Sequence, residues 1–72
     1  MTSLMFIIER AVAFGLRAKI WDEKNNIGVS LNDNGWYVIP SRDFLYLTRD
    51  MLDRELYRIK QELMESDPTY SF

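Results

Sequence analysis

Residues 16–40 read LRAKIWDEKNNIGVSLNDNGWYVIP, and their pattern is the strongest indication of the fold. An aliphatic side chain stands at every second position along residues 16–21 and again along residues 27–31. This period of two is typical of strands that bury one face. Residues 36–39 are all β-prone aromatic or branched types, and Pro40 after them ends the run. The three runs predict a three-stranded antiparallel meander.

Turn-forming residues separate the three predicted strands. Lys24, Asn25 and Asn26 supply the first turn, and Asn34-Gly35 supplies the second. An Asn-Gly pair tolerates the positive φ angles of a two-residue hairpin turn, so we expect a tight turn at these two residues.

An amphipathic helix is predicted before the first strand. Thr2 or Ser3 can cap its start, and Gly15 can end it with a positive φ angle. Its apolar residues recur three and four positions apart, at Leu4, Ile7, Ile8, Ala11 and Phe14. We favour the helix over the alternative, a short strand at residues 4–8, which the β-prone Ile and Phe side chains also permit.

A long second helix is predicted over residues 42–66. Ser41 can cap its start, and Asp43 in the first turn suits the positive end of the helix dipole. One apolar stripe runs along this helix, formed by Leu45, Leu52, Leu56, Ile59 and Leu63. The helix should stop near Ser66, before an Asp-Pro pair.

The predicted order of elements is α-β-β-β-α, an α+β fold with both helices packed on one face of the meander. Residues 1–66 form a single domain and residues 67–72 form a C-terminal tail. This order is similar to that of the double-stranded-RNA-binding domain. That family is expected to carry a Lys-rich start to the last helix and a His-bearing loop between the first two strands. Here the last helix begins Ser41-Arg42-Asp43 and the chain has no His, so the similarity concerns the order of elements alone.

The composition excludes several classes of site. The chain has 72 residues with no Cys and no His, which removes disulfides and Cys/His zinc sites. The core must therefore hold by packing, or with help from a second chain. The net charge of -2 gives no overall positive field for nucleic acid. The apolar run at residues 4–8 is too short for a signal sequence or a membrane span, and we expect a cytoplasmic protein.

No group of residues predicts catalysis, a cofactor or a bound metal ion. His and Cys, the usual general base and the strongest nucleophile, are absent. Asp22 and Glu23 are adjacent in a predicted strand, so their carboxylates should point to opposite faces. Asp50 and Asp53 lie one helical turn apart and can share a cation, although neighbouring arginines favour a solvated surface. We expect a protein that is not an enzyme.

Two apolar surfaces exceed what the predicted fold can cover. Met5 and Phe6 spread apolar surface around a first helix that is already apolar on one side. At ~1.5 Å per residue, the second helix would be roughly 37 Å long and would extend beyond a domain about 28 Å across. Ile59, Leu63 and Met64 would carry apolar surface into that extension. Uncovered apolar surface marks a partner site, so we expect a protein partner or a second copy to bind at these five residues.

These features favour a small interaction protein that binds another macromolecule, with a protein as the partner. Its size and lack of catalytic chemistry are typical of the regulators and inhibitors that phages and mobile elements encode, and we expect a homodimer.

The alternative is a nucleic-acid-binding module. Arg17, Lys19 and Trp21 share one face of the first predicted strand. Two residues of the third strand share that face, either Trp36 and Val38 or Tyr37 and Ile39. A basic strand with aromatic neighbours can stack on bases and hold phosphate groups.

Overall fold

The computed structural model describes residues 2–33 and 35–66. Its elements are α1 (Leu4–Ala13), β1 (Arg17–Ile20), β2 (Ile27–Ser30), β3 (Tyr37–Ile39), α2 (Ser41–Phe44) and α3 (Arg49–Ser66). The α+β class and the predicted order of helix, three strands and helix are confirmed, with the short α2 added before the last helix. The predicted tail, residues 67–72, lies outside the described residues.

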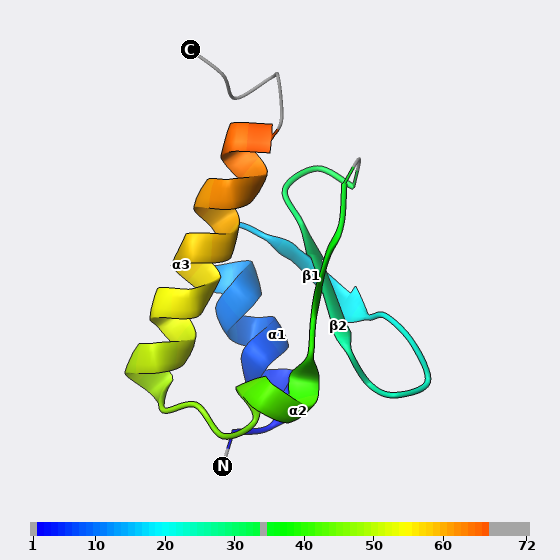
Figure 1. Cartoon of the computed structure of the whole chain (residues 1–72), viewed down its shortest axis with the longest axis vertical. Coiled ribbons are helices and arrows are strands. Elements are labelled where there is room, and N and C mark those ends of the chain that lie inside the picture. Colours follow the sequence, from blue (N-terminus) through cyan, green and yellow to red (C-terminus); the bar gives the residue numbers. More distant parts are fainter. Residues whose placement is uncertain (1, 34, 67–72) are drawn as a thin grey trace.

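The strands form one antiparallel sheet in the order β1-β2-β3, as a meander requires (Figure 1). Residues directly opposite each other share a face of a sheet. One face carries Ile20, Ile27 and Ile39, and the opposite face carries Lys19, Gly28 and Val38. We call the first the inner face, because Ile27 and Ile39 are fully buried in it. The second is the outer face.

Both long helices lie on the inner face, with α1 between α3 and the strands in the view of Figure 1. One core joins them to the sheet, formed by Ile7, Ala11, Leu16, Ile27, Val29, Ile39, Phe44, Leu52, Leu56 and Ile59. Arg10 of α1 donates hydrogen bonds of 2.9 and 3.0 Å to the Asp53 carboxylate of α3. Lys60 of α3 donates a third, of 2.6 Å, to the Phe14 carbonyl after α1. The outer face has no second layer among the described elements.

Residues 4–8 form helix and not strand. The Ser3 hydroxyl accepts a hydrogen bond from the Phe6 N–H, which caps the start of α1. Gly15 follows the end of α1 with a φ of 85°. Its N–H donates to the Val12 carbonyl, and the Leu16 N–H donates to the Ala11 carbonyl. This pair of bonds is the Schellman arrangement, which needs a residue with positive φ, and it confirms the predicted role of Gly15.

The predicted continuous helix over residues 42–66 is wrong in one respect, because it is divided. The short α2 ends at Phe44, and α3 begins at Arg49. The Thr48 hydroxyl accepts a hydrogen bond from the Met51 N–H and so caps a new helix start. Such local side-chain bonds compete with a continuous helical backbone. Ser41 is the first residue of α2 and not its cap, since Pro40 occupies the cap position without a side-chain bond.

The predicted two-residue turn at Asn34-Gly35 does not fit the register of β2 and β3. Val29 lies opposite Tyr37, so the connection is centred on Asp33, which has a φ of 67°. The Ser30 hydroxyl accepts hydrogen bonds from the Asn32 and Asp33 N–H groups and turns the chain early. Asn34 itself lies outside the described residues.

The loop between β1 and β2 is organised by Asp22, which the sequence pattern placed in a strand beside Glu23. Its carboxylate accepts hydrogen bonds from the Lys24 N–H, the Asn26 N–H and the Asn26 side-chain amide. The turn chemistry predicted for residues 24–26 is confirmed, and Asn25 has a φ of 62°. The Asn26 hydrogen bonds hold the pKa of the Asp22 carboxyl below its usual value.

Candidate functional site: the outer face of the sheet

Two tryptophans and a lysine form a cluster on the outer face. Trp21 follows β1 and Trp36 precedes β3, and their ring centroids are 5.6 Å apart at an interplanar angle of 38°. The Lys19 Nζ lies 4.5 Å from the centroid of Trp36 and 5.4 Å from that of Trp21. A cation at this range is attracted by the negative face of an aromatic ring. We call these three residues the indole cluster.

Gly28 makes room for the indole cluster. A Cβ atom at this position of β2 would overlap Trp21 Cε3. The Trp21 ring therefore lies across the bare backbone of the central strand, and any larger residue would displace it. Gly28 is buried although it belongs to the outer face, because the indole covers it.

The indole cluster is partly open to solvent. Trp21 is 41% exposed and the neighbouring Val38 of β3 is 39% exposed. Arg17 lies two residues before Lys19 and forms an ion pair of 3.1 Å with Asp33. Among residues 2–33 and 35–66, none of the ion pairs includes Lys19. Within that part of the chain, the outer face thus presents an apolar aromatic surface with one cation that has no carboxylate partner.

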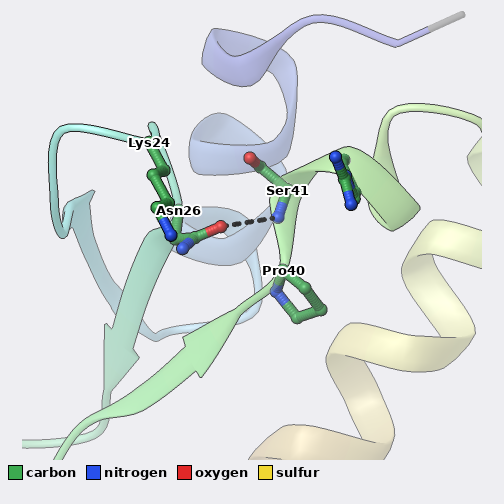
Figure 2. Close-up of a pocket in the computed structure, with 5 residues that line it drawn as sticks. Lys24, Asn26, Pro40 and Ser41 are labelled. Atoms are coloured by element: carbon green, nitrogen blue, oxygen red, sulfur yellow. Dashed lines mark hydrogen bonds between the residues drawn. The ribbon is translucent and has the colours of Figure 1, made fainter.

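A hollow with a volume of about 530 Å³ lies between the β1–β2 loop and the start of α2. Its walls are formed by Lys24, Asn26, Pro40, Ser41 and Arg42. Figure 2 shows Lys24 and Asn26 on one side and Pro40 and Ser41 on the other. The Asn26 side-chain oxygen accepts a hydrogen bond of 3.4 Å from the Ser41 N–H and links the two sides.

The structure places the three predicted nucleic-acid residues on one face of the sheet. Arg17, Lys19 and Trp21 all belong to the outer face, and Lys19 contacts Trp21. Of the two alternatives for the third strand, Trp36 and Val38 share this face. Gly28, the seat of the Trp21 ring, was not predicted. The alternation along residues 27–31 does place Gly28 opposite the face of Ile27 and Val29. Which side chain of β1 covers Gly28 depends on the register between β1 and β2, which the sequence pattern does not give.

The five predicted partner residues do not form one surface. Ile59 is fully buried in the core of the chain itself, so it carries no apolar surface beyond the sheet. Leu63 and Met64 are half-buried, and Phe6 is half-buried and packs against the core. Met5 alone is exposed, at 62%.

Part of the surface of α1 that does not face the sheet lies against α3. Arg10 bonds Asp53 of α3, and Phe6 lies one turn before Arg10 on the same side of α1. The Asp53 hydrogen bonds raise the pKa of the Arg10 guanidinium. Asp53 is therefore committed to Arg10 and not poised to share a cation with Asp50.

The described residues contain no group of three or more acidic side chains that could hold a metal ion. None of the helices within residues 2–33 and 35–66 has the length and apolar character needed to cross a membrane.

Comparisons with known proteins identify no relative. No family model matches the chain, no curated protein is significantly similar to its sequence, and no solved structure is significantly similar to its fold.

Proposed function

We propose that the chain is a non-enzymatic binding protein of the cytoplasm that contacts a protein partner through the outer face of its sheet. The observation that carries this proposal is the indole cluster, two tryptophans on a sheet face that has no second layer among the described elements. Tryptophan is strongly enriched among the residues that dominate the energy of protein interfaces. Val38 adds exposed apolar surface beside the exposed Trp21 ring.

The charges of the outer face favour a partner segment with a carboxylate between apolar side chains. Lys19 is a cation in the middle of the apolar surface, and its ammonium has no acidic partner among the described residues. A carboxylate of the partner could form an ion pair with the Lys19 ammonium, and the surrounding apolar surface would partly exclude water from that pair. A second copy of this chain suits the face poorly, because a two-fold contact centred on the indole cluster would bring each Lys19 toward its counterpart.

A nucleic-acid partner is less favoured by the same face. Phosphate binding depends on cations that are free to neutralise the backbone. Arg17 is already paired with Asp33, and the net charge of the chain is -2. Nucleic-acid binding remains the second candidate function, because the exposed Trp21 ring could stack on a base.

Selection from a library of displayed peptides tests the proposal and does not require the partner to be identified first. The wild type serves as bait, and peptides that also bind the Val38→Glu variant are removed, so that Lys19→Glu remains an independent test. We expect the remaining peptides to combine a carboxylate with aromatic or aliphatic residues. Their affinity should fall about tenfold or more in Lys19→Glu, where a charge-assisted contact becomes a repulsion.

Two controls keep the selection interpretable. Arg54→Glu and Tyr57→Glu change exposed side chains of α3 in the same way and should leave binding unchanged. Melting temperatures of all four variants show whether each is folded. Equal losses in the α3 variants would contradict the proposal. So would micromolar binding of a single-stranded RNA at physiological salt that weakens steeply with added salt, which would favour the second candidate.

A further inference from the structure

The hollow beside α2 has a one-sided charge. Two of its lining residues are charged, and both are cations, Lys24 and Arg42. Neither belongs to an ion pair among residues 2–33 and 35–66. Two unpaired cations at the wall of one cavity attract an anion more strongly than either does alone.

Ser41 adds a hydroxyl group to the wall of the hollow. The residue is only 4% exposed, yet it lines the hollow. No hydrogen bond joins its hydroxyl to another described residue, and Figure 2 shows the hydroxyl pointing toward the side on which Lys24 lies. No enclosed polar side-chain atom of the described residues lacks a hydrogen-bond partner, so this hydroxyl faces the open hollow, where it can donate to a bound acceptor.

We propose that this hollow binds a phosphate group. A phosphate offers three or more oxygens to several donors at once, which matches a guanidinium, an ammonium and a hydroxyl arranged around one space. The hollow is separate from the proposed protein contact, because none of the residues of the indole cluster lines it.

The two sides of the hollow are held in place before any ligand arrives. Asn26 donates to the Asp22 carboxylate from one end of its amide and accepts from the Ser41 N–H at the other. Asp22 also accepts from the Lys24 N–H, so its negative charge is occupied in the loop. A prearranged site loses less conformational entropy on binding than a flexible one.

Titration with inorganic phosphate, followed by ¹⁵N-resolved amide spectra, tests the proposal directly. We expect saturable shifts confined to the amides of Lys24, Asn26, Ser41 and Arg42 and their neighbours. Sodium chloride at matched ionic strength should not reproduce them. Lys24→Gln with Arg42→Gln should weaken binding about tenfold or more, and Ser41→Ala should weaken it by a smaller factor.

A matched control changes two exposed cations elsewhere. Arg49→Gln with Arg54→Gln alters the net charge by the same amount on α3 and should leave phosphate binding unchanged. Equal weakening by both pairs, or shifts spread over all basic residues, would overturn the proposal and indicate a general charge effect. Absence of saturation at millimolar phosphate would overturn it as well.

Parallel titrations distinguish the source of the phosphate group. Phosphoserine represents a modified protein, and a dinucleotide with a 5′-phosphate represents nucleic acid, with the unphosphorylated dinucleotide as its control. If inorganic phosphate binds as well as both, the site recognises the free ion. Loss of peptide binding in the Lys19→Glu variant leaves these titrations unaffected, so the two proposals fail separately.

Discussion

At Gly28 the outer face has space for an indole ring and none for a Cβ atom. Gly28→Ala should therefore destabilise the fold by roughly 1–3 kcal/mol, the usual cost of forcing extra volume into a packed site. The substitution should also separate the tryptophans and weaken their near-ultraviolet circular dichroism. Denaturant unfolding measures the first effect and the spectrum measures the second.

Removing the ring provides the control. In a Trp21→Ala background the new methyl group meets no indole, so the cost of Gly28→Ala should largely disappear. If Gly28→Ala were equally destabilising in that background, the glycine would be required for its backbone conformation and not to make room for the Trp21 ring.

Among the helices, the start of α3 depends on Thr48. Its hydroxyl bonds the Met51 N–H at 3.3 Å, while its carbonyl accepts from the Leu52 N–H at 2.8 Å. Thr48→Ala removes only the hydroxyl bond, and it should lower the free energy of unfolding by about 1 kcal/mol. Thr48→Ser should restore most of the loss, because serine caps as well as threonine. If Thr48→Ala left the free energy of unfolding unchanged or raised it, the Thr48 cap would not explain why the helix is interrupted between α2 and α3.

For the whole molecule, we expect a monomer at micromolar concentration. A homodimer through α1 would need both Met5 and Phe6 uncovered, and Phe6 packs against the core. Met5 and Val12 remain exposed, but Glu9 lies between them on the same side of α1. Two apolar side chains bury too little area for a stable dimer.

Sedimentation equilibrium measures the mass directly. A dimer that Met5→Glu dissociates would restore the α1 interface, whereas one that Val38→Glu dissociates would place a second copy on the outer face. Neither substitution touches the core, since both side chains are exposed. Each result therefore identifies a surface and not a folding defect.

Most of the helices and strands can be predicted from the amino-acid sequence. Alternation along residues 16–21 and 27–31 is a local signal, and so are the Ser3 cap and the Gly15 ending of α1. These features involve residues only a few positions apart, so they can be recognised from the sequence alone. The grouping of Arg17, Lys19 and Trp21 on one face was predictable for the same reason, because side chains in a strand alternate.

Which surfaces stay exposed depends on how the elements pack against one another. Ile59 and Phe6 look alike as apolar residues in the sequence, yet one is fully buried and the other half-buried because α1 and α3 cover each other. The register of β2 against β1 and β3 set Gly28 under Trp21, and it brought Asn26 near Ser41 at the wall of the hollow. Such contacts join residues distant in the chain, and their partners depend on packing between elements, which no local pattern encodes.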